Sequence, residues 1–321
     1  MTQELILTPL TNDFIAHLQK QGKTQNTLKN YRTDLDCYKN YLEVNQNRKH
    51  IINPELSHVL DYGKFLQLKY SSDNSRRRRV QTLRLFFDFL LIKGLVKENP
   101  VRKIPSSPKF VDVPKPITFN EILRWWRFFK TEHKSASPEF ETAKLIVQRN
   151  QIIFSCIFFG GLKVSDLSTL QVGDINLHEN GPRILITHAK RDPYTVELPD
   201  YLTELFEKYL TELRRQQVQN SLHFKNVFFN ANPYRILSGG LSPRGIEIIF
   251  EELRNKIDGS ATPKKLRESA ICRWINLKKN ESTIKEWMGV APSYSLKRFK
   301  DISENFFYGE EAMQEILNYK D

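Results

Sequence analysis

Cysteine is scarce in this sequence: the 321 residues contain only Cys37, Cys156 and Cys272, which lie far apart among apolar residues. Neither a disulfide framework nor a cysteine-rich metal site is indicated. The seven histidines show no metal-ligand spacing, so we expect no metal and no other cofactor. Long apolar runs are also lacking, because the longest, Ile152 to Leu162, is about half of what spans a bilayer. We expect a buried helix there and no membrane partner.

Acidic residues are outnumbered, with 37 Asp and Glu against 49 Lys and Arg, which gives a formal net charge of +12. This balance favours a polyanionic partner, nucleic acid ahead of an anionic membrane surface, although a merely basic soluble protein would show it too. The first residues, MTQELILTPLTNDF, lack the basic and apolar segments of a secretory signal. We therefore expect a cytoplasmic protein associated with the DNA of the cell or its nucleoid.

The length predicts two domains, the first of them helical and covering residues 1–98. In TQNTLKNYRTDLDCYKNYLE the apolar residues recur at three- and four-residue steps, with Asn26 or Thr27 placed to cap a helix. A second helix is expected in RRVQTLRLFFDFLLIKGL, which has a wide apolar face and Gly94 near its end. The proline-rich stretch Asn99 to Pro116 is predicted to be a linker.

The remaining residues, 117–321, predict a mostly helical domain with a small sheet. PRILITH and YTVELP alternate like strands and are joined by AKRDP, which predicts a hairpin, with NVFFN as a possible third strand. Helices are expected in TFNEILRWWRFF, QIIFSCIFFGG, VSDLSTL, RGIEIIFEELRNKI, KKLRESAICRWINLKK and EEAMQEILNY. Ser165 lies near the expected start of the third of these helices.

Several of these segments, in this order, resemble the tyrosine recombinases, the phage-integrase and Xer-like enzymes that cut and rejoin DNA. NTLKNYRTDL and RRVQTLRLFFDFLLIKGLVKENP resemble their core-binding domain, whereas RNQIIFSCIFFGGLKVSDLSTLQVGDINL, TPKKLRESA and KEWMGV resemble their catalytic domain. The resemblance implies a mainly α fold: a helical, SAM-like core-binding domain in residues 1–98, a linker in 99–116, and an α+β catalytic-type domain with a small antiparallel sheet in 117–321.

The resemblance also implies which residues surround a DNA phosphate. Such enzymes use a tyrosine hydroxyl to attack the phosphodiester and cationic donors to stabilise the charge that builds up. In GLK, Lys163 is at the position where the family has its first arginine. A lysine keeps the positive charge but cannot make two parallel hydrogen bonds to a phosphate as a guanidinium can. KKLR keeps the second arginine as Arg267 and has Lys264 at the histidine or lysine position. The hairpin lysine position corresponds to His188 or Lys190.

Two further positions depart from the family pattern. The residue after MG, usually histidine or tryptophan, is Val290, which can neither donate a hydrogen bond nor share a proton. Nine residues further on, where the family has its nucleophile, the sequence has Phe299. Weakening one donor slows an enzyme, but removing the attacking oxygen leaves no covalent step. The alternative is cleavage through Tyr294, Tyr308 or a tyrosine of a second subunit.

The leading hypothesis is therefore a catalytically inactive protein that clamps duplex DNA on a tyrosine-recombinase scaffold, in a regulatory, architectural or accessory recombination role. The alternative is a divergent active recombinase or integrase. The residues expected to contact DNA are Arg76, Arg77, Arg78, Arg79, Arg84, Lys163, Lys190, Lys264 and Arg267. The final segment, residues 309–321, is a candidate for self-association or for docking to an active recombinase.

Overall fold

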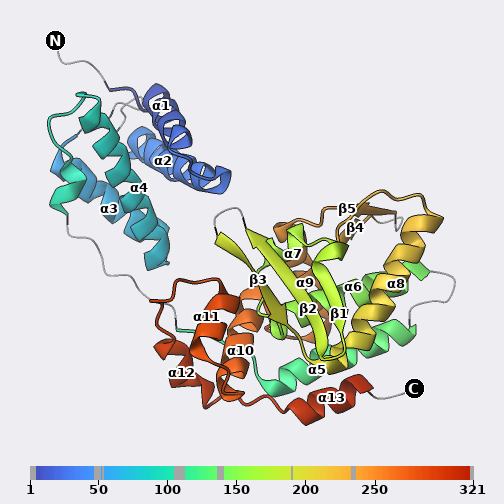
Figure 1. Cartoon of the computed structure of the whole chain (residues 1–321). Coiled ribbons are helices and arrows are strands. Elements are labelled where there is room, and N and C mark those ends of the chain that lie inside the picture. The colour runs from blue at the N-terminus through green and yellow to red at the C-terminus, as the bar shows by residue number, and fades with distance from the viewer. Residues whose placement is uncertain are drawn as a thin grey trace. The chain divides into compact units, whose positions relative to one another are not determined.

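The chain folds into two compact units, residues 1–112 and 113–321, in the computed structural model shown in Figure 1. The structure describes residues 5–46, 52, 54–104, 113–135, 141–188, 191–232 and 236–318. Each unit has its own hydrophobic core. The fold is mainly helical with small antiparallel sheets, which confirms the predicted fold class. Within the described residues no helix is both long and apolar enough to cross a membrane.

The first unit consists of α-helices and one short 3-10 turn. They are α1 (Leu7–Lys20), α2 (Gln25–Gln46), α3 (Leu56–Lys69), α4 (Asp73–Ile92) and η1 (Pro100–Lys103). The predicted cap of α2 is wrong, since the helix begins at Gln25 and the hydroxyl of Thr24 accepts the Thr27 N–H at 3.3 Å. Helix α4 also begins earlier than predicted, because Ser72 caps it and accepts the Ser75 N–H. The four consecutive arginines therefore lie within α4 itself.

A buried carboxylate joins α2 to α4. Asp34 has a fully buried side chain, and it accepts hydrogen bonds from Arg78 at 2.7 Å and from the Thr82 hydroxyl at 2.9 Å. Arg79 Nε lies 3.9 Å from the same carboxylate, and the Arg79 guanidinium stacks on the Tyr70 ring, 3.8 Å from its centroid. A charge taken out of water must be paired, so these contacts fix how the two helices pack.

Both ends of the predicted linker pack against a unit. The Asn99 side chain donates to the Arg84 carbonyl at 2.8 Å and to Asp88 at 2.7 Å, and Arg102 makes two hydrogen bonds to Asp88. Burial alone would raise the pKa of Asp88, but the hydrogen bonds from Arg102 and Asn99 outweigh it and lower that pKa. At the other end, the Ile117 N–H donates to a serine hydroxyl of the second unit at 2.9 Å. Residues 105–112 lie outside the described ranges.

The second unit is built around one buried helix. Its helices are α5 (Phe119–Ser135), α6 (Glu141–Phe158), α7 (Val164–Thr169), α8 (Thr203–Gln219), α9 (Pro243–Ile257), α10 (Pro263–Asn276), α11 (Glu281–Met288), α12 (Lys297–Ser303) and α13 (Glu310–Asn318), with the 3-10 turns η2 (Val172–Asp174) and η3 (Asp200–Leu202). The apolar run from Ile152 to Leu162 is buried throughout, which confirms the prediction for it. Helices α5, α8 and α10 all pack against α6.

The main sheet has three antiparallel strands in the order β1 (Ile175–His178), β2 (Gly181–His188) and β3 (Arg191–Glu197). The predicted hairpin is β2 and β3, and it is confirmed. NVFFN does not join this sheet. Its end forms β4 (Phe229–Ala231), which pairs with β5 (Leu237–Gly239) in a separate sheet. Sequence reasoning missed β1, although Asn180 in the turn and Gly181 at the start of β2 together form a strong hairpin signal.

The last helix, α13, is docked on its own unit. Glu310 receives two hydrogen bonds from the buried Arg273, at 2.5 and 2.8 Å, and one from the Tyr201 hydroxyl at 3.1 Å. Met313 is fully buried, and α13 packs against α5 and η3. Docking of this segment on another molecule, which stays a prediction, would have to break these contacts.

Replacing Asp34 with alanine should destabilise the first unit by about 3 kcal/mol, because the buried Arg79 would lose its counter-charge. Urea unfolding of the whole chain, followed by circular dichroism, measures this change. Asp61→Ala is the matched control: Asp61 pairs with Lys64 on the surface of α3, where both side chains are more than half exposed, so it should cost no more than about 1 kcal/mol. Equal losses in the two variants would contradict a structural role for Asp34.

Candidate functional site

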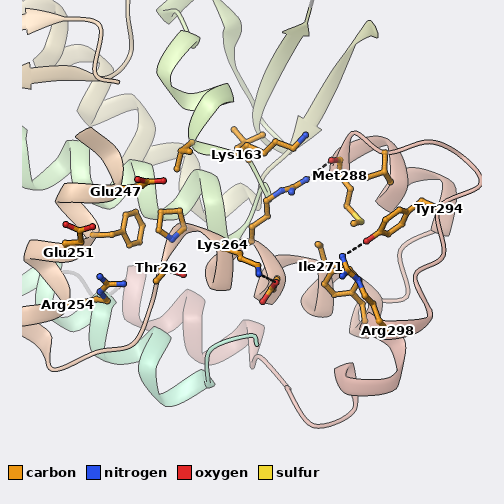
Figure 2. Close-up of a pocket in the computed structure, with 18 residues that line it drawn as sticks. Lys163, Glu247, Glu251, Arg254, Thr262, Lys264, Ile271, Met288, Tyr294 and Arg298 are labelled. Atoms are coloured by element: carbon orange, nitrogen blue, oxygen red, sulfur yellow. Dashed lines mark hydrogen bonds and ion pairs between the residues drawn. The ribbon is translucent and has the colours of Figure 1, made fainter. Parts of the chain in front are cut away.

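A cavity of about 640 Å³ opens among α7, α9, α10, α12 and the loop after α11, and it gathers most of the predicted site residues (Figure 2). Five of the seven predicted positions line it: Lys163, Lys264, Arg267, Val290 and Phe299. These residues are scattered over more than a hundred positions of the sequence. The motifs that carry the family resemblance therefore meet in one place.

Arg267 is held by two backbone carbonyls. From α10 its Nε donates to the Gly161 carbonyl at 2.7 Å and its Nη2 donates to the Met288 carbonyl at 2.6 Å. Gly161 has a positive φ of 59°, and a Cβ there would lie 2.4 Å from the Trp274 ring, so only glycine fits. Gly289 ends α11 in the left-handed region, at φ 62°, immediately after the second carbonyl. Arg267 thus ties the end of α6 and the end of α11 to α10.

Lys163 precedes α7 and is its N-cap residue. Its backbone N–H donates to Asp166 Oδ2 at 2.9 Å, while the other oxygen of Asp166 lies 3.4 Å from His188 Nε2. Ser165, expected near the start of this helix, is its second residue, and Lys163 and Asp166 form the capping arrangement. His188 is at the end of β2, next to a register shift in the β2–β3 pairing, and its ring stacks on Tyr194. His188 does not line the cavity, and Lys190 lies outside the described residues.

The predicted nucleophile position has an apolar, buried side chain. Phe299, in α12, is 2% exposed and belongs to the core of the second unit. Val290 lines the cavity between α11 and α12 and adds a second apolar side chain. Neither residue can attack a phosphate or move a proton.

Two tyrosines were considered as substitutes, and the structure separates them. Tyr308 is 4% exposed, and its hydroxyl donates to the Ile117 carbonyl at 2.7 Å. Burial raises the pKa of Tyr308, and this residue does not line the cavity. Tyr294 is half-buried and does line it, and its hydroxyl accepts a hydrogen bond from Arg298 Nη2 at 2.5 Å.

Sequence reasoning missed two arginines of the cavity, Arg254 and Arg298. Together with Lys163, Lys264 and Arg267 they give five cationic side chains in the lining, against three carboxylates, Glu247, Glu251 and Glu268. In Figure 2, Glu247, Glu251 and Arg254 lie on one side of the lysines, and Tyr294 and Arg298 lie on the other. Position 298 directly precedes Phe299, and this adjacency was the one available signal for Arg298.

The cavity therefore has the charge to accept an anion. Its lining combines five cationic side chains with apolar ones such as Val290 and Phe299, and Tyr294 supplies the single phenol among them. Groups of three or more His, Cys, Asp or Glu residues that could hold a metal ion do not occur in the described ranges.

The basic residues of α4 differ in exposure. Arg78 is exposed and Arg76 and Arg77 are half-buried, whereas Arg79 is only 8% exposed. Arg84 donates to the Ile104 carbonyl at 2.9 Å, and Arg76 donates to the Tyr70 carbonyl at 2.7 Å. Arg79 and Arg84 thus take part in the packing of the first unit, and a role for all five in DNA contact stays a prediction.

Comparison with known proteins finds one matching domain family and several similar tyrosine recombinases. Residues 11–94 match the family described as phage integrase, N-terminal SAM-like domain. The chain is 24% identical to the tyrosine recombinase XerD of Listeria monocytogenes serovar 1/2a, an alignment that covers 94% of this chain and 99% of that protein. It is also 24% identical to the tyrosine recombinase XerC of Herpetosiphon aurantiacus, over 91% of this chain and 90% of that one.

Two solved structures share the fold at low identity. A lambda integrase dimer bound to a COC′ core site matches 96% of this chain and 81% of its own, with a TM-score of 0.66 and 13% identity. XerH site-specific recombinase bound to palindromic difH substrate, in a post-cleavage complex, matches 91% of this chain and 79% of its own, with a TM-score of 0.67 and 13% identity.

Changing Arg267 to lysine should lower the free energy of unfolding by about 1–3 kcal/mol, because one ammonium cannot reach both carbonyls in the geometry of the guanidinium. Thermal unfolding of the whole chain measures this loss. The control is Lys264→Gln on the same helix: its side chain is 67% exposed and lies 3.9 Å from Glu268, so the change should stay within about 0.5 kcal/mol. If Arg267→Lys is as mild as the control, Arg267 does not hold the cavity together.

Proposed function

We propose that this chain, which belongs to the tyrosine recombinase family, binds duplex DNA without cutting it, in a regulatory, architectural or accessory recombination role. The single observation that carries this proposal is Phe299. A buried phenylalanine occupies the nucleophile position, in a cavity that still has a cationic lining. Function has to be argued from such a site, since a fold alone can serve many activities.

Double-stranded DNA as the ligand is supported from two directions. The structural neighbours are recombinases bound to a core site and to a difH substrate, and the net charge of +12 suits a polyanion. Contacts to phosphates would supply most of the affinity through the release of counterions. They would position the protein on the duplex, whereas sequence preference would depend on contacts to base edges.

Both units would contribute contacts to the phosphates of the duplex. In the first unit Arg77 and Arg78 on α4 are the candidates for phosphate contact, and Arg78 is exposed although one of its nitrogens donates to Asp34. In the second unit Lys163 and Lys264 would supply charge at the cavity, since Arg267 is already held by two carbonyls. We propose that the two units clamp the duplex from separate sites.

The side chains of the cavity support the proposed absence of cleavage. Removing one donor that stabilises the transition state costs on the order of 10²–10³ in rate and leaves a slow enzyme. Removing the nucleophile is a different kind of loss, because no bond to phosphorus can form. Phe299 has no hydroxyl and Val290 has no proton to donate. Lys163 has a positive charge but lacks the paired donors of a guanidinium.

Binding to a duplex of random sequence should weaken steeply with salt, by about 10³-fold or more between about 50 and 200 mM if six or more phosphates are contacted. Fluorescence anisotropy measures this change. The same protein, incubated with a nicked suicide substrate that traps covalent intermediates, should give no protein–DNA adduct on a denaturing gel. A phosphotyrosyl adduct would overturn the proposal that the chain does not cut.

One observation favours strand cleavage as a second candidate function: the Tyr294 phenol lines the cavity and accepts a hydrogen bond from a guanidinium. In that reaction the phenol oxygen would form a bond to phosphorus, the bond from phosphorus to the leaving deoxyribose oxygen would break, and the phenolic proton would end on the released hydroxyl. The turn from Val290 to Leu296 would have to bring this phenol to the phosphate.

Under this second candidate, Tyr294→Phe should abolish the adduct on the suicide substrate, and Tyr308→Phe should leave it. Tyr308 is a suitable control because its hydroxyl is buried and bonded to the Ile117 carbonyl. Mass spectrometry of the trapped peptide identifies the attached residue. An adduct that survives both substitutions would exclude these two tyrosines as nucleophiles.

A further inference from the structure

We propose that Arg298 grips a backbone phosphate at the cavity and supplies the bidentate contact that a lysine at position 163 cannot make. The inference rests on the proposed DNA binding and names the residue that would carry it at this site. Sequence motifs did not assign Arg298 a role. The structure places it in the wall of the cavity, half-buried, one position before Phe299.

Arg254 lies on the side of Glu247 and Glu251 in Figure 2, and the three remaining cations of the cavity are less suited to binding a phosphate through two donors at once. Two nitrogens of the Arg267 guanidinium are used to hold the Gly161 and Met288 carbonyls. Lys163 and Lys264 are point charges, and Lys264 lies 3.9 Å from the carboxylate of Glu268. Each of these three side chains can add to the positive electrostatic potential of the cavity. None presents a planar pair of available donors in the way that an oriented arginine does.

Arg298 is held in one orientation by its neighbours. Its Nη2 donates to the Tyr294 hydroxyl at 2.5 Å, and its guanidinium carbon lies 4.8 Å from the centroid of the Phe299 ring and 5.7 Å from that of Tyr294. Contact with aromatic faces suits a guanidinium better than an ammonium. An arginine oriented in this way loses less rotamer freedom when it binds a phosphate.

The carboxylates indicate at which end of the cavity the phosphate would lie. Glu247 and Glu251, both on α9, accept hydrogen bonds from Arg244. They lie on the side of the two lysines opposite to Arg298 in Figure 2. A phosphodiester would avoid these carboxylates and occupy the side formed by Lys163, Lys264 and Arg298.

Phe299 has a second role under this inference. Its buried ring supports the guanidinium of Arg298 through its face. Tyr294 becomes a positioning residue, because its hydroxyl accepts from Arg298 and fixes the plane of the donors. The aromatic pair would therefore serve binding, and neither ring would need to react.

The test compares Arg298→Gln with Lys297→Gln, since the two variants remove the same charge from adjacent positions of α12. Lys297 is exposed and does not line the cavity. The probe is a duplex of random sequence, with affinity measured by fluorescence anisotropy between about 50 and 200 mM salt. Arg298→Gln should lower the slope of log affinity against log salt by about 0.9 and weaken binding about tenfold. Lys297→Gln should change the slope by less than half of that.

Arg298→Lys keeps the positive charge but removes the planar pair of donors. It also provides a second variant in case Arg298→Gln does not fold. It should keep the salt slope of the unaltered chain and still bind about three- to tenfold more weakly. Equal effects of Arg298→Gln and Lys297→Gln, or full affinity of Arg298→Lys, would overturn the inference and leave the proposed DNA binding intact. Absence of salt-dependent binding by the unaltered chain would overturn the proposed function, and the inference with it.

Discussion

The cavity of the second unit depends on one side chain, the guanidinium of Arg267. Its hydrogen bonds to the Gly161 and Met288 carbonyls join the ends of α6 and α11 to α10. The segments that carry Lys163 and Val290 follow those two ends directly. Because a planar, permanently charged group makes both contacts, the walls of the cavity are set by a residue whose charge also faces into it. The same side chain therefore has a structural role and adds positive charge to the lining of the cavity.

The contacts around the cavity differ in how far they depend on a side chain. Arg267 holds two carbonyls with its side chain, whereas position 163 contributes its backbone N–H to the cap of α7. A lysine there leaves the local fold unaffected. The same holds for Val290, whose N–H bonds to the Lys285 carbonyl whatever the side chain is. The cap of α7 and the turn after α11 therefore use backbone groups at positions 163 and 290.

The order of motifs was enough to predict that Lys163, Lys264, Arg267, Val290 and Phe299 would meet, because a family fold brings fixed points of the chain together. Details that depend on geometry were not predictable. A run of arginines gives no sign that Arg79 is buried against Tyr70 and Asp34. Tyr294 lies in the cavity because of the turn between α11 and α12, and spacing along the chain cannot show where that turn directs a side chain. Strand β1 was missed through a neglected turn signal and not through any ambiguity.

An apolar side chain at position 299 suits the packing around it. At 2% exposure, a phenol there would be a buried polar group, which is costly unless it has a hydrogen-bond partner. Phenylalanine keeps the apolar contacts with the core and avoids that cost. Sites that keep a reactive group commonly give up stability for it. The proposed binding of DNA without cleavage would need no hydroxyl at this position, and the cationic lining of the cavity does not depend on one.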